Sequence, residues 1–440
     1  MRTGVSAVLL VNFIGTLGYS IVLPFLIFLV DRFGGNAVVY GLLAATYPSF
    51  QLLGAPVLGR WSDRWGRRRV LLLSQAGTLL GWLIFLIALF LPRFAVLHVV
   101  GTVLTLPLVV LFFARALDGI TGGNVSVAQA YMADISTEKD RATNFGRLAI
   151  SSNLGFILGP AIAGVLGATR WGDVPPVLVA LFVSAVGTAL VALYLPDSRP
   201  RPLPPEYAAP GLHKVLGQEP RTCVEPAGEA PGFPALLRLP MIPWLLAVYF
   251  VLFLGFNVFY TVFPVHALRA LGWTLADTGI FYSVMSLMMV VVEGPVLRRL
   301  SRSVSDIPLV RAGTLILGVN FALLFGADTP LTYLAAALFA LGNGLMWPSF
   351  LSVLARAAGP RHQGAVQGLG SAVGAAASIV GLIGGGLLYE RIEGAAFLVA
   401  AGLIELAFLM SFRLPAQPSH SRFGPLSSST AAMTGHPPGS

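Results

Sequence analysis

The sequence predicts an all-α integral membrane protein with twelve transmembrane helices, arranged as two six-helix bundles that repeat one another. Three observations support this fold class. Hydrophobic residues make up 56% of the chain and charged residues 11%, with a mean hydropathy of +0.80, whereas soluble proteins carry about 25% charged residues. Twelve apolar windows are long enough to cross a bilayer. The first six windows also share short motifs with the last six.

A transmembrane helix needs about 20 mainly apolar residues. Windows of that length lie at residues 5–30, 38–58, 70–92, 107–133, 144–168 and 174–195, and then at 243–267, 274–297, 307–327, 331–355, 364–389 and 394–413. The first window is too long for the core of a signal peptide, so we expect an uncleaved span. Residues 1–195 therefore form the N-terminal bundle and residues 241–413 the C-terminal bundle.

Two other segments lack the composition of a membrane span. Residues 196–240 contain eleven prolines and cannot bury a core, which predicts a cytoplasmic linker between the bundles. Residues 414–440 are rich in Ser, Pro and Gly and are predicted to be a disordered cytoplasmic tail.

The two halves carry matching motifs. The segment around Pro56 resembles the segment around Pro295, and Gly159 and Gly164 align with Gly381 and Gly386. An internal repeat of six spans favours a transporter whose site lies between the halves. Residues 93–106 are apolar and have no counterpart in the second half, so we expect an interfacial or re-entrant helix there.

The basic residues predict the orientation, because short loops rich in Lys and Arg stay on the cytoplasmic side. With both termini in the cytoplasm, cytoplasmic loops and tails hold 22 of the 28 Lys and Arg residues and external loops hold 5. The charge of +9 follows this pattern of loops rather than a binding stripe, so no nucleic-acid partner is expected. The preference for Arg over Lys indicates a bacterial genome, and hence the bacterial cytoplasmic (inner) membrane.

Four motifs, in order along the chain, match a known family. The basic hinge (residues 59–69) contains Gly59, Asp63, Arg64, Gly66, Arg67 and Arg68 in the pattern Gly-x-x-x-Asp-Arg-x-Gly-Arg-Arg. The other three are Gly18 to Pro24 in span one, Arg115 to Gly123 in span four, and Gly155, Gly159, Pro160 and Gly164 in span five. In these motifs the chain resembles the major facilitator superfamily, and in particular its 12-span drug:proton antiporters of the tetracycline and multidrug exporter kind.

The resemblance implies a secondary active transporter that exports hydrophobic or amphipathic small molecules, such as drugs, in exchange for protons. The proton gradient would replace any cofactor, and no P-loop or metalloprotease motif indicates an enzyme or a metal site. The expected partners are a small-molecule substrate and the lipid bilayer, for a chain acting as a monomer. One alternative is uptake or export of a metabolite or lipid on the same scaffold. Another is a membrane sensor or structural protein that transports nothing.

The basic hinge has two interpretations. Its five arginines alone would hold the loop in the cytoplasm. That role does not need Gly59, Gly66 or Asp63, and the resemblance implies that Asp63 latches the two halves in one transport state. Asp134, at the inner end of span four, is the expected second partner for Arg67 or Arg68.

Charged residues within spans are the candidates for proton coupling. Arg115 and Asp118 are three residues apart and share a helix face, and charges inside a span usually mark an ion or proton path. We expect Asp118 to exchange the proton and Arg115 to modulate its affinity, although a self-neutralising structural pair is the alternative. Related exporters commonly have a small apolar residue in place of Asp118. Glu293 and Glu405 are further candidates, with snorkelling or a structural hydrogen bond as their alternatives.

Polar and aromatic residues within spans are candidates for the substrate cavity. They are Asn12, Tyr19, Asn124, Gln129, Asn257, Tyr260, Asn343 and Trp347. A mainly apolar and aromatic lining with few polar anchors suits an amphipathic organic molecule. Ordinary helix packing is the alternative for many of them. The glycines of span five are expected to allow close packing, and Pro160 to bend the helix.

Overall fold

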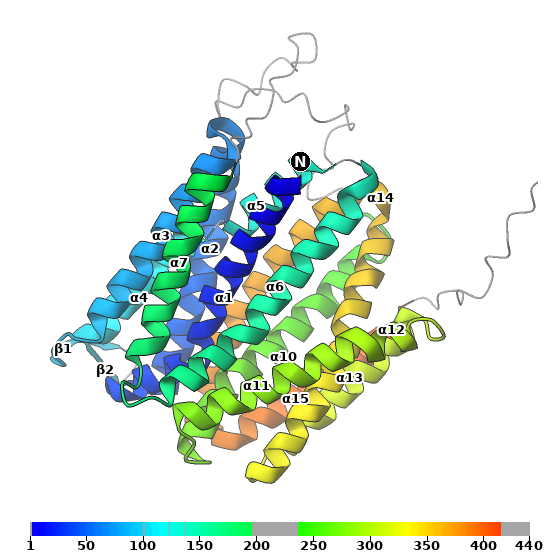
Figure 1. The fold of residues 1–440 in the computed structure, drawn as a ribbon. Coiled ribbons are helices and arrows are strands. Elements are labelled where there is room, and N and C mark those ends of the chain that lie inside the picture. Colours follow the sequence, from blue (N-terminus) through cyan, green and yellow to red (C-terminus); the bar gives the residue numbers. More distant parts are fainter. Residues whose placement is uncertain (1, 100–101, 123, 137, 196–235, 415–440) are drawn as a thin grey trace, which may run out of the picture.

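The computed structural model describes residues 2–99, 102–122, 124–136, 138–195 and 236–414. The first half contains α1 (Arg2–Arg32), α2 (Ala37–Trp65), α3 (Arg67–Ala88), α4 (Leu106–Thr121), α5 (Asn124–Ile135), α6 (Glu138–Gly167) and α7 (Val174–Tyr194) (Figure 1). The second half contains α10 (Ile242–Arg269), α11 (Leu275–Val291), the π turn η2 (Val292–Val296), α12 (Leu297–Leu300), α13 (Asp306–Leu323), α14 (Thr329–Ile392), η3 (Glu393–Ala395) and α15 (Ala396–Ser411).

The described helices account for twelve membrane crossings. Ten helical stretches are long and apolar enough to cross a membrane, and one of them, Gly368–Ser411, holds two spans in its 44 residues. The twelfth crossing consists of α4 and α5, which are separated at residues 122–123 and are each too short to be counted alone. The predicted all-α fold of membrane-spanning helices is therefore confirmed, and the described helices are consistent with two bundles of six.

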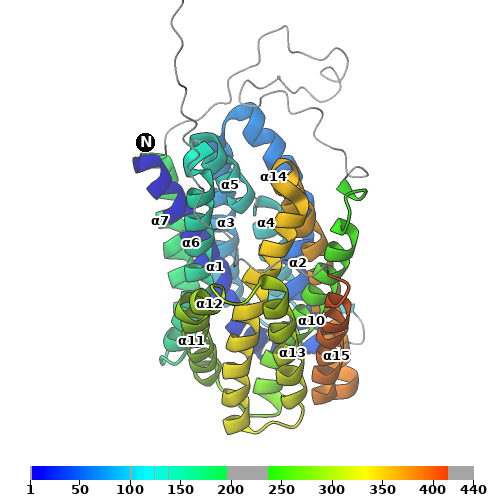
Figure 2. The ribbon, with the colours of Figure 1, turned by 90° about the vertical axis from the view of Figure 1, so that its right-hand side faces the viewer.

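Helix α14 covers two spans because its backbone breaks once. Gly359 has φ +67° and ψ +166°, a conformation that costs glycine little and other residues much more. Figure 2 shows the first part of α14, in yellow, running the full height of the bundle before the chain turns back.

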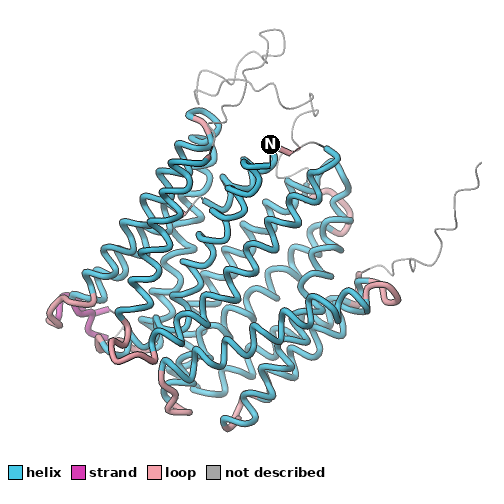
Figure 3. Tube along the Cα trace, viewed as in Figure 1, coloured by secondary structure: helices cyan, strands magenta, loops and turns pink. Residues whose placement is uncertain are grey.

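The loops gather at two opposite ends of the bundle (Figure 3). We call one the basic end, because it carries the hinge between α2 and α3. We call the other the hairpin end, because it carries the two strands between α3 and α4. Three helices that start at the hairpin end, α2, α11 and α14, have side-chain caps. Asn36, Thr274 and Asp328 each accept a hydrogen bond from a backbone N–H of the first turn.

The described part of the segment from Arg93 to Leu106 contains two antiparallel strands, which we call the β-hairpin, so the prediction of an interfacial or re-entrant helix was wrong. Strand β1 (Ala95–Val99) pairs antiparallel with β2 (Thr102–Thr105), and Leu97 lies opposite Leu104. Valine and threonine dominate the segment, and these β-branched residues favour strands over helices. The inward-facing backbone groups of the two strands pair with each other.

Glycines set the packing of α6 on α1 and of α14 on α10, which are equivalent pairs in the two halves. A Cβ at Gly159 would lie 2.8 Å from the backbone nitrogen of Ile21, and one at Gly381 would lie 2.9 Å from the carbonyl oxygen of Leu254. Hydrogen bonds repeat the relationship: Ser20 donates to the Gly155 carbonyl at 2.8 Å, and Thr261 donates to the Leu382 carbonyl at 3.2 Å. Small residues thus bring backbones together where lipid offers no hydrophobic driving force.

The two halves meet at the hairpin end. A Cβ at Gly164 of α6 would lie 2.2 Å from the Cα of Gly279 of α11, and one at Gly386 of α14 would lie 2.4 Å from the Ala37 carbonyl oxygen of α2. In the part of the chain that the structure describes, both hydrogen bonds between the halves also lie toward this end. They join Tyr40 to the Tyr260 carbonyl and Ala37 to Glu390.

Candidate functional site

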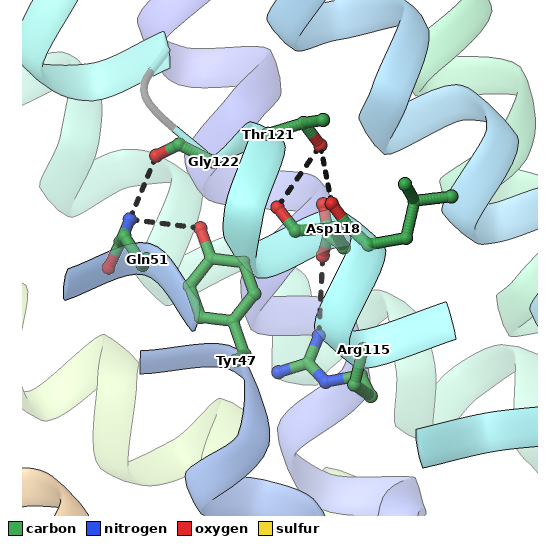
Figure 4. A network of polar contacts seen from close by, with 7 residues as sticks. Tyr47, Gln51, Arg115, Asp118, Thr121 and Gly122 are labelled. Atoms are coloured by element: carbon green, nitrogen blue, oxygen red, sulfur yellow. Dashed lines mark hydrogen bonds and ion pairs between the residues drawn. The ribbon is translucent and has the colours of Figure 1, made fainter. Parts of the chain in front are cut away.

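Arg115 and Asp118 form a buried ion pair on α4, within the first half (Figure 4). Their side chains are 4% and 12% exposed, and Nη1 of Arg115 lies 3.5 Å from Oδ2 of Asp118. Charge-assisted hydrogen bonds of this kind usually measure about 2.7–2.9 Å. The pair is therefore loose, which leaves much of the arginine's hydrogen-bonding capacity available.

Two tyrosines supply the rest of the environment of Arg115. Its guanidinium carbon lies 4.8 Å from the ring centre of Tyr47 and 5.6 Å from that of Tyr19. Both distances are within the range of cation–π attraction, which strengthens when the partners are removed from water. The two rings are themselves 4.8 Å apart. Helices α1, α2 and α4 thus stabilise one buried positive charge together.

Gln51 of α2 positions this part of α4. Its Nε2 donates to the Tyr47 hydroxyl at 3.1 Å and to the Gly122 carbonyl at 3.0 Å, as Figure 4 shows. The second bond satisfies a carbonyl at the end of α4, where the helix leaves its partners unpaired. Gly119 allows the close approach of α2, since a Cβ there would lie 2.5 Å from the Tyr47 carbonyl oxygen.

Asp118 faces α3. A small cavity of about 10 Å³ lies beside it, lined by Gly81, Trp82, Phe85, Ala114, Arg115 and Asp118. This volume is close to the lower limit for a single water molecule. Gly81 creates the space, because a Cβ there would lie 3.3 Å from the Cβ of Asp118. The cavity beside the Asp118 carboxylate is therefore too small for a substrate molecule.

The basic hinge is held within the first half. Gly66 makes the turn between α2 and α3 with φ +98°, a conformation that strongly favours glycine. Arg67 is buried, and its Nε donates to Asp134 at 2.8 Å while its Nη1 donates to Ser62 at 2.6 Å. The pairing of Asp134 with Arg67, expected from the sequence, is thus present. Arg68 instead bonds the Ala192 carbonyl of α7. The side chain of Asp63 lies outside the described residues, so its predicted latch stays a prediction.

The second half has a corresponding pair that the sequence reasoning missed. The carboxylate of Asp306, at the start of α13, pairs with the guanidinium of Arg356 on α14. Spans three and four of the first half carry Arg67 and Asp134 at the same relative positions, with the charges exchanged. The sequence does carry a signal for this pair: Asp306 lies at the start of one predicted span, and Arg356 lies at the end of the next.

The other carboxylates proposed for proton coupling lie apart from this site, in the second half. Glu293 lies in η2 and packs against Gly344 of α14, since a Cβ added at Gly344 would lie 3.5 Å from the Cγ of Glu293. Glu405 of α15 packs against Gly318 of α13.

Two of the residues predicted for the substrate cavity are used for helix packing. The amide nitrogen of Asn12 lies 2.8 Å from the Ser151 hydroxyl and 2.6 Å from the Ser152 hydroxyl, which join α1 to α6. The Asn257 amide donates to the Ser378 hydroxyl at 3.0 Å, joining α10 to α14.

The remaining cavity candidates are placed as follows. Tyr19 contacts Arg115, the Tyr260 ring lies 6.5 Å from the Phe256 ring, and Trp347 lies in an aromatic cluster with Tyr249, Phe253 and Phe350. Asn343 lies on α14 and is half-buried. The side chains of Asn124 and Gln129 lie outside the described residues. Among the described side chains of this set, only Tyr19 is shown in contact with the Arg115–Asp118 pair.

Residues 8–382 match the sequence model of the Major Facilitator Superfamily. The chain belongs to this superfamily. It is therefore a multi-pass membrane transporter for small molecules rather than an enzyme, as the sequence motifs predicted.

Individual relatives agree with this assignment. The chain is 26% identical to the class D tetracycline resistance protein of Salmonella ordonez over 367 residues, which cover 82% of this chain and 83% of the relative. It is 25% identical to the class B protein of Escherichia coli over 426 residues, which cover 93% and 97% of the two chains. A crystal structure of a D-xylose-proton symporter has the same fold, with a TM-score of 0.72 and 13% identity over 94% of this chain and 97% of that one.

Proposed function

We propose that this transporter exports hydrophobic or amphipathic small molecules in exchange for protons, by alternating access between its two halves. The observation that carries the proposal is the loose, buried Arg115–Asp118 pair held against two tyrosine rings. Similarity to tetracycline resistance proteins over most of the chain supports a drug-like substrate. A charge pair inside a span is costly and is kept where it serves ion or proton movement.

Asp118 is the proposed proton carrier. When its carboxylate is ionised, it neutralises Arg115 within the first half. When the carboxyl is protonated, the ion pair is lost, and the guanidinium depends on Tyr19 and Tyr47 for stabilisation. Protonation thus changes the balance of forces among α1, α2 and α4. These helices could then shift relative to the second half, which would couple proton transfer to alternating access.

Aromatic side chains favour a planar or amphipathic substrate. Tyr19 lies 6.0 Å from Phe156 in the first half, and Trp347 lies 5.2 Å from Phe253 in the second half. Ring faces bind apolar and cationic organic groups without strict geometry. We propose that these two sets of rings face the substrate from the two halves.

The basic end is proposed to face the cytoplasm of a bacterial cell, with the chain in the inner membrane as a monomer and without a nucleic-acid partner. The arginines of the hinge support this orientation through the positive-inside rule. In this proposed orientation, the contact between the halves at the hairpin end lies on the external side of the membrane. Asp63 of the hinge is the proposed latch of the halves in one transport state.

The proposal is tested in proteoliposomes by following proton movement on addition of substrate from a panel of tetracyclines and lipophilic dyes. Asp118→Asn keeps the size and one acceptor oxygen of the side chain but cannot exchange a proton, so substrate-triggered proton movement is expected to stop. Glu405→Gln, an equivalent change in the second half, is the matched control and is expected to retain it. Normal proton movement in Asp118→Asn would remove this residue as the carrier. Inward substrate movement under the same gradient would indicate uptake.

A further inference from the structure

An apolar pocket opens between the two halves on the side of the bundle that carries the β-hairpin. Its volume is about 440 Å³, within the range of small-molecule sites. It is lined by α2, which includes Thr46 and Ser49, by Leu97 and Leu104 of the hairpin, by α4, and by Ile383 of α14. Because Ile383 belongs to the second half, the pocket is complete only when the halves meet at the hairpin end.

Apolar atoms form most of the surface of the pocket among the described residues. Its two hydroxyls are already bonded within α2, where Thr46 donates to the Leu42 carbonyl at 2.8 Å and Ser49 donates to the Ala45 carbonyl at 2.7 Å. A site without polar partners does not hold ordered water well and accepts apolar groups. The ligand is therefore recognised by its hydrocarbon part.

The hairpin closes one side of the pocket. Leu97 and Leu104 are directly opposite one another in the register and both line the pocket. Phe94, Val96 and Val103 are exposed on the same hairpin, at 53%, 43% and 37%. Figure 1 places the hairpin at an edge of the bundle. Exposed apolar side chains at the edge of a membrane-spanning bundle face lipid, so the pocket lies next to acyl chains.

One unpaired charge lies near the pocket. Arg93 is exposed, contacts the Phe33 ring at 5.7 Å, and has no ion-pair partner among the described residues, whereas its neighbour Arg32 pairs with Asp173 at 2.8 Å. Arg93 precedes Leu97 by four residues, which span at most about 14 Å. A phosphate at Arg93 and a hydrocarbon chain beside Leu97 are thus within reach of one lipid molecule. Guanidinium groups bind phosphate strongly.

We infer that this pocket binds one acyl chain of an anionic phospholipid from the leaflet at the hairpin end, with the lipid phosphate at Arg93. The inference does not depend on the transported substrate, since it rests on the pocket, the hairpin, the exposed Arg93 and the membrane location. The lipid would contact both halves and would therefore favour the state in which they meet at this end.

The experiment uses the full chain in nanodiscs that contain a trace of phosphatidylglycerol with a diazirine in one acyl chain. After illumination, labelled peptides are identified by mass spectrometry. We expect labels to concentrate in residues 38–50 and 103–112, with unlabelled phosphatidylglycerol competing several-fold better than phosphatidylcholine. Labels spread over all lipid-facing helices in proportion to exposure would overturn the proposal.

Two variants test the separate parts of the site. Thr46→Phe fills the pocket and is expected to lower labelling there at least fivefold, whereas Thr188→Phe on α7, whose hydroxyl makes the same kind of intrahelical bond, is expected to leave labelling unchanged. Arg93→Gln should abolish the preference for phosphatidylglycerol, and Arg391→Gln, an exposed arginine at the same end, should keep it. Displacement of the probe by transported dyes would assign the pocket to the substrate and overturn the lipid proposal. Unchanged labelling in Thr46→Phe would also overturn the lipid proposal.

Discussion

The carboxylate of Glu390 accepts a hydrogen bond of 2.7 Å from the backbone N–H of Ala37, the first residue of α2. Glu390 lies on α14 of the second half, and the same oxygen is 2.8 Å from Nη1 of Arg269 on α10. A negative charge at a helix N-terminus accepts a hydrogen bond from an otherwise unpaired N–H and interacts favourably with the positive end of the helix dipole. The second half thus caps a helix of the first half, which stabilises their contact at the hairpin end.

Loss of this cap should open the hairpin end. Glu390→Ala removes a partly exposed ion pair and a cap, which together are worth about 1 kcal/mol, so the ratio of closed to open states should fall about fivefold. Spin labels on cysteines at Trp171 and Ile392, which are exposed in opposite halves, would report a broader and longer distance distribution in a Cys223→Ser background. Glu393→Ala at the same end is the control, and an equal change in both variants would contradict the prediction.

Gly164 and Gly279 should tolerate no side chain. Since a Cβ at Gly164 would lie 2.2 Å from the Cα of Gly279, Gly164→Ala must separate α6 from α11 at the hairpin end. We expect transport to fall at least tenfold while expression remains normal, measured as substrate efflux from cells. Gly402→Ala, at a helical glycine whose Cβ would have open space, should leave transport unchanged. Wild-type efflux in Gly164→Ala would show that the halves do not need this contact.

Arg115 should not be replaceable by lysine, although the charge is the same. The planar guanidinium contacts both Tyr19 and Tyr47, and a lysine ammonium cannot stack on two rings in this way. A loss of about 1–2 kcal/mol of cation–π attraction corresponds to about a 5- to 30-fold fall in coupled transport. Tyr47→Phe keeps the ring and should cost little, whereas Tyr47→Leu should resemble Arg115→Lys. Equal activity of the two Tyr47 variants would exclude the ring as the stabilising element.

The Arg67–Asp134 pair should contribute to the stability of the first half. Asp134→Asn removes the carboxylate that accepts a hydrogen bond from Nε of the buried Arg67, and we expect a loss of about 1–3 kcal/mol, observed as a lower unfolding temperature in detergent. Asp306→Asn breaks the corresponding pair of the second half and should lower stability similarly. Asp63→Asn should instead lower transport with little effect on stability, because its proposed partner is the other half. A stability loss in Asp63→Asn equal to that of Asp134→Asn would argue against a latch.

Local features of the sequence predicted the spans and the fold class. Hydropathy is a property of each sequence window, and the basic residues of a loop decide on which side of the membrane that loop stays. These predictions therefore need no knowledge of neighbouring helices. The spacing of Arg115 and Asp118 likewise placed both on one helix face, and the structure pairs them. The segment at 93–106 was assigned wrongly because its apolar character was given more weight than its β-branched residues.

Only the tertiary structure decided which helix faces meet. Polar groups within spans all look alike in the sequence, yet the Asn12 and Asn257 amides bond to serines of α6 and α14, whereas Tyr19 and Tyr47 surround Arg115. The contact of Gly164 with Gly279, and that of Glu390 with Ala37, join residues more than a hundred positions apart. Lipid surrounds every helix with the same apolar environment, so hydropathy does not indicate the rotation of a helix. Packing of small residues and satisfaction of buried polar groups decide it instead.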